Sequence, residues 1–146
     1  MKPEWIVSAC LCGIPCRYDG GSKKIETICR WVEEGRALPV CPEQLGGLPT
    51  PRIPCEIRGE QVVDKEGNDR TAAFALGAQR TWEICRSHGI TKGVLKQRSP
   101  SCGSCQIYDG SFSGVVIPGK GITARLLLEK GVTLWDETQI EEITEK

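Results

Sequence analysis

The sequence has 146 residues and balanced charge, with 19 Lys and Arg against 19 Asp and Glu. This length suits one hydrophobic core, so we expect residues 1–146 to form a single domain. The balanced charge provides no basic surface for nucleic acid or an anionic membrane, and we expect a small-molecule partner instead.

Nine cysteines are the unusual feature of the composition. Their number is odd, and their density is below that of small scaffolds built on disulfides. The N-terminus, MKPEWIVSACLCG, has a short apolar run that is neither a secretory signal nor a membrane span. We therefore expect a cytoplasmic protein with reduced thiols, in which a cysteine cluster indicates metal binding or catalysis.

The first part of the chain predicts two buried strands with a helix between them. The first strand is expected from Glu4 to Cys10 and is followed by Gly and Pro. The helix has Ser22 as its N-cap, apolar residues at helical spacing and Gly35 just past its end. The second strand covers Ala37 to Cys41 and enters a loop rich in Gly and Pro.

The middle of the chain predicts a hairpin, a long helix and a third strand. Residues 56–69 resemble an exposed hairpin with glycine turns. Asp69 or Thr71 caps a helix that closes at His88, where a cation suits the helix dipole. The third strand is expected over residues 93–97.

The C-terminal part predicts a long ordered loop, SPSCGSCQIYDGSFSG, because its Ser and Gly residues continue neither helix nor strand. A helix over 122–130, a strand over 132–135 and a helix from about Glu137 follow. This order predicts an α/β fold, a mainly parallel sheet flanked by helices with right-handed crossovers. The order of the strands is left open.

Three cysteines lie at, or a few residues past, the ends of three different predicted strands: Cys10, Cys41 and Cys102. In open α/β sheets the C-terminal edge is where ligands bind. We therefore expect these three thiols to converge there and to form a functional site.

The spacing of the cysteines leaves the chemistry of that site open. A zinc site would use the pair Cys102 and Cys105 with the looser pair Cys12 and Cys16. A redox dithiol is less favoured, because the residues after Cys105 are poor helix formers. Three separated cysteines also suit an iron–sulfur cluster with one open iron, which is a Lewis acid rather than only an electron carrier.

The other cysteines have simpler interpretations. Cys29 and Cys85 lie on apolar helix faces, where a free cysteine acts as a small buried hydrophobe. Cys55 follows a proline and has no predicted partner.

Four stretches resemble the thiouracil desulfidase family, formerly catalogued as a domain of unknown function. They are VSACLCG with CRYDGGSKK (7–24), PVCPEQLGGLPTPR (39–52), LKQRSPSCGSCQIYDGSFSG (95–114) and GITARLLLEKGV (121–132). They span nearly the whole chain in the family's order. The resemblance implies a [4Fe-4S] cluster held by three cysteines, Cys10, Cys41 and Cys102, with a fourth iron open to the sulfur of a small thiocarbonyl substrate such as 2- or 4-thiouracil.

The resemblance also implies roles for other residues. Glu43 corresponds to the active-site carboxylate, and either Ser99 or Ser101 to a nearby serine. Asp19 matches a family motif, as a substrate-binding residue or as a turn. The implied reaction is an oxygen-sensitive, non-redox hydrolysis that releases hydrosulfide and the oxo compound. The alternative, from another functional class, is a noncatalytic module in which Cys102, Cys105 and two of Cys10, Cys12, Cys16 and Cys41 hold zinc for stability.

Two positions depart from the family pattern. Relatives carry an apolar residue in place of Cys12 and Gly in place of Cys105. A thiolate from either position on the fourth iron would close the open site, and we expect both to stay away from it. The sequence leaves open the oligomeric state and whether the substrate is a free base, a nucleoside or a nucleotide.

Overall fold

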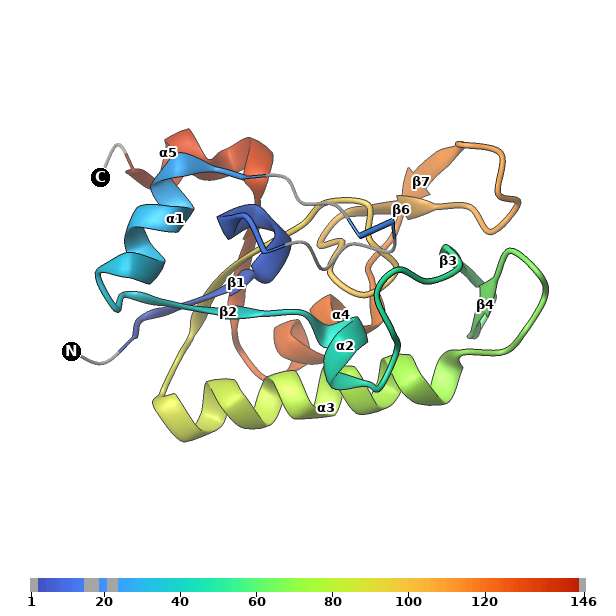
Figure 1. The fold of residues 1–146 in the computed structure, drawn as a ribbon, viewed down its shortest axis with the longest axis horizontal. Helices are drawn as coiled ribbons and strands as arrows, with labels where there is room; N and C mark the ends of the chain where they lie inside the picture. The colour runs from blue at the N-terminus through green and yellow to red at the C-terminus, as the bar shows by residue number, and fades with distance from the viewer. Residues whose placement is uncertain (1–2, 15–18, 21–23, 145–146) are drawn as a thin grey trace.

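The computed structural model describes residues 3–14, 19–20 and 24–144. It confirms the α/β fold with a parallel sheet (Figure 1). Four parallel strands form the central sheet, in the order β2-β1-β5-β8. Their bounds are β1 (Trp5–Ser8), β2 (Ala37–Val40), β5 (Lys92–Leu95) and β8 (Thr133–Asp136).

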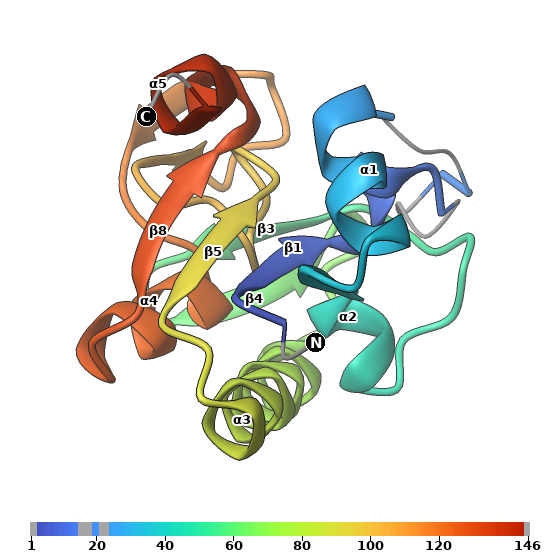
Figure 2. The same cartoon turned by 90° about the vertical axis from the view of Figure 1, so that its left-hand side faces the viewer.

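The helices cover both faces of this sheet, as Figure 2 shows. From β1 the chain goes to β2 on one side and later to β5 and β8 on the other. Right-handed crossovers in opposite directions must lie on opposite faces. One face therefore carries α1 (Glu26–Glu33) and α5 (Ile140–Thr144), and the other carries α2 (Pro42–Leu45), α3 (Thr71–His88) and α4 (Ile122–Glu129).

The central strand β1 is buried on both faces. Trp5 and Val7 pack in one apolar cluster with Trp31 of α1. Ile6, between them in sequence, packs in a second cluster with Leu127 of α4. Alternate strand residues point to opposite faces, which explains why β1 is a continuous apolar run.

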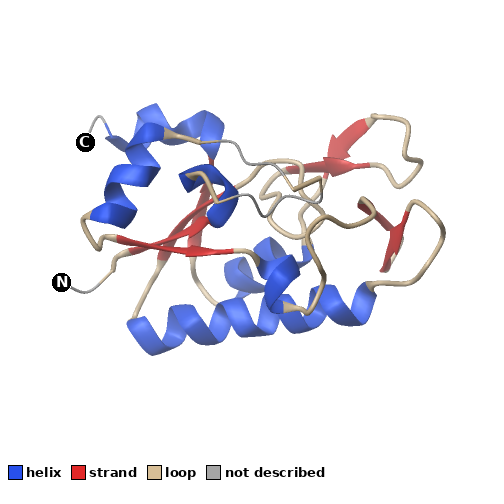
Figure 3. Ribbon diagram, in the orientation of Figure 1, coloured by secondary structure: helices blue, strands red, loops and turns tan. Residues whose placement is uncertain are grey.

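Two antiparallel hairpins lie beyond the C-terminal edge of the sheet (Figures 1 and 3). The first is the predicted hairpin, formed by β3 (Cys55–Arg58) and β4 (Gln61–Asp64). The second, β6 (Gln106–Tyr108) and β7 (Val116–Pro118), lies where a loop was predicted. The loop prediction was wrong. The two strands of this hairpin have only three residues each, too few to show an alternating pattern, and they enclose a turn rich in Ser and Gly.

Two other local predictions need correction. The first strand ends at Ser8, and Ala9–Cys12 forms a 3-10 helix, η1. Residues 42–45 form the short helix α2 rather than a loop, with Pro42 at its first position, where a missing N–H costs nothing. The predicted N-cap Ser22 lies outside the described residues.

The C-terminal end of the chain agrees with the prediction. A second 3-10 helix, η2 (Glu137–Gln139), leads from β8 into α5.

None of the helices in the described part of the chain is long and apolar enough to cross a membrane.

Candidate active site

A cavity of about 460 Å³ opens at the C-terminal edge of the sheet. The segments that follow β1, β2 and β5 contribute one part of its wall, and the two hairpins contribute another part. Cys10, Cys41 and Cys102 all line it. The structure thus brings together the three cysteines selected from the strand ends. The cavity lies where the strand order changes direction, the usual ligand position in such sheets.

Each of these cysteines is positioned by the end of a strand. Cys10 is in η1, immediately after β1, and Cys41 is the residue between β2 and α2. Cys102 lies in a turn after β5, in which the Ser99 hydroxyl oxygen accepts hydrogen bonds from the backbone N–H groups of Ser101 (3.1 Å) and Cys102 (3.0 Å). Ser99 therefore shapes the segment that presents Cys102.

The Cys102 thiol is buried, and two other groups that can carry a negative charge lie near it. Burial raises its pKa to about 12, and the Cys41 thiol and the Glu43 carboxylate act in the same direction. Hydrogen bonds from the Ser8 and Ser101 side chains oppose this shift. With this pKa the thiol is protonated at neutral pH. A metal centre is the kind of partner that would convert it to a thiolate ligand.

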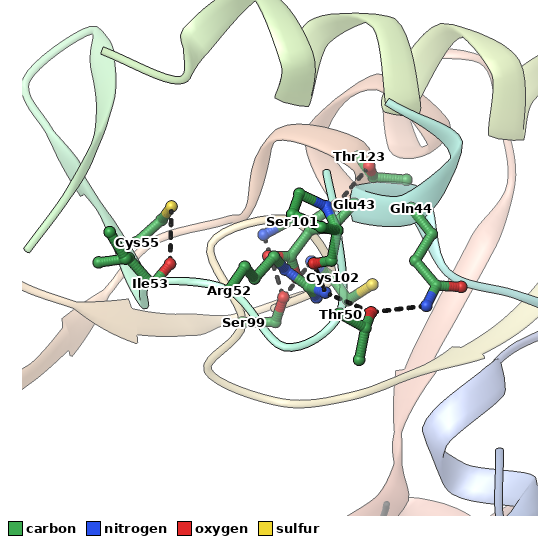
Figure 4. Close-up of polar contacts among 11 residues, drawn as sticks. Glu43, Gln44, Thr50, Arg52, Ile53, Cys55, Ser99, Ser101, Cys102 and Thr123 are labelled. Carbon is green, nitrogen blue, oxygen red and sulfur yellow. Dashed lines mark hydrogen bonds and ion pairs between the residues drawn. The ribbon is translucent and has the colours of Figure 1, made fainter. Parts of the chain in front are cut away.

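Glu43 lies in the first turn of α2 and also lines the cavity. Its Oε1 accepts a hydrogen bond from Arg52 Nε at 3.2 Å (Figure 4). These side chains are only 17% and 5% exposed, respectively. Arg52 is itself fixed by hydrogen bonds from Nη1 to the Pro49 carbonyl (3.1 Å) and to Thr50 Oγ1 (3.0 Å). The pair gives the carboxylate a defined orientation.

The two candidate serines lie in different surroundings. Ser99 lines the cavity. Ser101 is 1% exposed, and its hydroxyl is 2.7 Å from that of the buried Thr123 (Figure 4). Asp19 is exposed and is not among the described residues that line the cavity.

Three other cysteines lie near the proposed ligands in sequence, and the structure describes two of them, Cys12 and Cys105. Cys12 donates a hydrogen bond to the Ala9 carbonyl (3.2 Å) inside η1, and Cys105 is exposed. Neither lines the cavity in the described part of the chain. Cys16 lies outside the described residues.

The donor set suits a polynuclear group better than a single ion. Among the described residues, no three His, Cys, Asp or Glu side chains lie close enough together to hold one metal ion. A tetrahedral zinc site would need such a group. Three thiols spread around a larger cavity instead fit an iron–sulfur cluster, which cysteines hold from its outside.

Sequence reasoning assigned no role to three cavity residues: Cys55, Tyr108 and Phe112. Burial raises the pKa of Cys55 to about 11, and the nearby carboxylates of Glu43 and Asp64 add to the shift. Tyr108 and Phe112 could have been found from their place in YDGSFSG, which is part of a stretch that resembles the thiouracil desulfidase family.

Comparisons with known proteins agree with this geometry. Residues 6–139 match the family described as 2-thiouracil desulfurase. The uncharacterized protein YbbK of Bacillus subtilis (strain 168) is 40% identical, over 94% of this chain and 98% of that protein. A solved structure described as [4Fe-4S]-dependent thiouracil desulfidase TudS is 48% identical, with a TM-score of 0.93 over 98% of this chain and 96% of that chain. The chain belongs to the 2-thiouracil desulfurase family.

Proposed function

We propose that this protein is a [4Fe-4S]-dependent enzyme that removes sulfur from thiouracil or a related thiolated pyrimidine. The observation that carries the proposal is the convergence of Cys10, Cys41, Cys102 and Glu43 on one cavity. The similarity to TudS over nearly the full length of both chains supports the same activity.

Cys10, Cys41 and Cys102 would hold the cluster. When bound through three thiolates, the cluster would supply an iron without a protein ligand, a soft Lewis acid that accepts the thiocarbonyl sulfur. Neither Cys12 nor Cys105 lines the cavity, so neither is placed to take that position from the substrate. Cys55 also lines the cavity and is not one of the proposed ligands.

Glu43 is the proposed general base. It takes a proton from a water molecule that attacks the carbon bearing the sulfur, and it returns the proton as the C–S bond breaks. Arg52 holds one carboxylate oxygen at 3.2 Å and so fixes the direction of the other. The thiocarbonyl compound and water yield the carbonyl compound and hydrogen sulfide, and no electrons are gained or lost.

The two serines take different parts in this proposal. Ser99 lines the cavity, and its hydroxyl, which accepts two backbone hydrogen bonds, can donate its proton in a hydrogen bond to the substrate or the water. The Ser101 hydroxyl interacts with the Cys102 thiol and with Thr123, so it supports a ligand rather than the substrate.

Anaerobic reconstitution with iron and sulfide tests the activity. We expect a brown protein that releases hydrosulfide from 2-thiouracil or 4-thiouracil, or from their nucleosides or nucleotides. Glu43→Gln should retain iron and sulfide and lose most of the turnover. A colourless protein with stoichiometric zinc would contradict the cluster, and full turnover by Glu43→Gln would remove this residue from proton transfer.

Cysteine variants test the ligand set separately from the activity. Cys10→Ser, Cys41→Ser and Cys102→Ser should each lower the iron bound per chain. Cys12→Leu and Cys105→Gly are the matched controls and should bind as much iron as the wild type. Loss of iron in either control would show that the assigned ligands are wrong.

A further inference from the structure

Phe112 has an unusual backbone conformation next to the cavity. It lies in the turn between β6 and β7 and lines the cavity wall. Its φ is 58°, in the left-handed region that a bulky side chain rarely adopts. Such residues persist where the surrounding structure fixes them, and they are concentrated at binding sites.

The first hairpin fixes this turn. Oε1 of Glu56, a residue only 9% exposed, accepts hydrogen bonds from the N–H groups of Gly110 (2.9 Å) and Phe112 (3.2 Å). Arg58 donates from Nε (3.1 Å) and Nη2 (2.7 Å) to the Gly110 carbonyl. A Cβ on Gly110 would lie 2.7 Å from the Ile57 carbonyl oxygen, so this close approach requires glycine.

Packing in the hydrophobic core does not explain why the backbone of Phe112 is held in this strained conformation. In the described part of the chain it belongs to none of the three buried apolar clusters. It is half-buried at the cavity, with the Arg58 guanidinium carbon 5.9 Å from its ring centroid. A strained backbone, a buried carboxylate and an arginine thus hold one aromatic residue in the cavity wall.

We propose that Phe112 stacks on the planar ring of the substrate, and that Glu56 and Arg58 position it for this contact. The proposal rests on the proposed function, since it identifies the substrate class of the same cavity as a flat, conjugated heterocycle. The π face of a phenyl ring packs well on such a heterocycle, and nucleobases stack on aromatic side chains in the same way.

The test compares ring binding with turnover in the reconstituted enzyme. Phe112→Leu keeps an apolar side chain but removes the π face, and Phe112→Trp keeps it. Val115→Ala, an exposed position in the same turn that does not line the cavity, is the matched control. The readouts are kcat and KM for hydrosulfide release from 2-thiouracil, and the inhibition constants of uracil and of 5,6-dihydrouracil, whose saturated ring is not flat.

We expect Phe112→Leu to raise the KM and the uracil inhibition constant roughly tenfold, within the range measured for base stacking. Its kcat should not change, because stacking stabilises the ground and transition states equally. The wild type should prefer uracil to 5,6-dihydrouracil, and Phe112→Leu should lose this preference. Phe112→Trp, which keeps the π face, should retain the preference for uracil, and Val115→Ala should behave as the wild type.

Glu56 variants test the positioning role. Glu56→Ala should raise the KM as Phe112→Leu does, and Glu56→Gln, which keeps an acceptor oxygen, should restore most of the affinity. Unchanged uracil binding in Phe112→Leu, or in Glu56→Ala if the first variant does not fold, would overturn the proposal. A wild type that releases no hydrosulfide from any thiocarbonyl compound would instead contradict the proposed function.

Discussion

The close crossing of α2 and α3 makes Gly77→Ala the most informative substitution away from the cavity. A Cβ built on Gly77 would lie 1.9 Å from the Pro42 carbonyl oxygen, and one on Gly46 would lie 2.0 Å from that of Ala73. Real Cβ atoms essentially never approach closer than 3.0 Å. Alanine at position 77 must therefore move α2 away from α3 by about 1 Å, judged from these contact distances.

The displacement should affect both stability and catalysis. Overpacking costs about 1–3 kcal/mol, and the upper end applies because the obstructing atoms belong to the backbone. Alanine recovers about 1 kcal/mol of helix propensity, which leaves a net loss of about 2 kcal/mol. Glu43 follows Pro42 directly, so it moves with α2. A misplacement of about 1 Å can lower a rate about 100-fold.

Urea unfolding and hydrosulfide release from 2-thiouracil would measure these effects. Ala75→Gly, on the exposed side of the same helix, is the control. It should lose about 1 kcal/mol of stability from helix propensity and keep its turnover. A Gly77→Ala enzyme as active as the wild type would refute the idea that the glycine contact sets the position of Glu43.

Three further predictions follow from single side chains. Arg52→Met should lower kcat for hydrosulfide release roughly tenfold at unchanged iron content, and Arg52→Lys should restore only part of it, because an ammonium group lacks the planar fork that holds Glu43. Ser101→Ala should lower the free energy of unfolding in urea by about 1–3 kcal/mol, since the Thr123 hydroxyl loses its buried partner; an unchanged value would contradict this role. Burial raises the pKa of Cys55 to about 11, so only a small fraction of this thiol is a thiolate at neutral pH. The rate of Cys55 alkylation, measured by mass spectrometry, should therefore rise about tenfold per pH unit from neutral pH to about pH 10. Rapid alkylation at neutral pH would contradict this prediction.

The elements that the sequence predicted correctly are those with local signals. The long helix α3 has helical periodicity and ends at His88 before Gly89, as predicted, although its N-cap is Arg70 rather than Asp69 or Thr71. The parallel strands are short apolar runs bounded by Gly and Pro. Because strand ends of a parallel sheet share one edge, the positions of Cys10, Cys41 and Cys102 in sequence predicted that they gather at that edge, and the strand order that makes them neighbours came from the structure.

The features that were missed depend on contacts between distant segments. The strands β6 and β7 are too short for an alternation of polar and apolar residues to be recognised in the sequence. The contact between Gly46 and Gly77 joins two helices, and nothing in either segment alone indicates that their backbones touch. The conformation of Phe112 is imposed by Glu56, which is far away in sequence. The strand order likewise depends on how the crossovers pack rather than on local pattern.

The two hairpins form small sheets of their own, separate from the four-stranded sheet. A single β-bridge joins Ile107 of β6 to Arg98, in the segment that follows β5. The sheet edge supplies the three cysteines and Glu43, whereas the hairpins supply Phe112 and the residues that hold it. In the proposed mechanism, reactivity and ring recognition are thus encoded in different segments. A library confined to residues 53–64 and 106–118 could change which heterocycle is accepted and leave Cys10, Cys41, Cys102 and Glu43 untouched, which makes this small scaffold a starting point for desulfurising other thioamides.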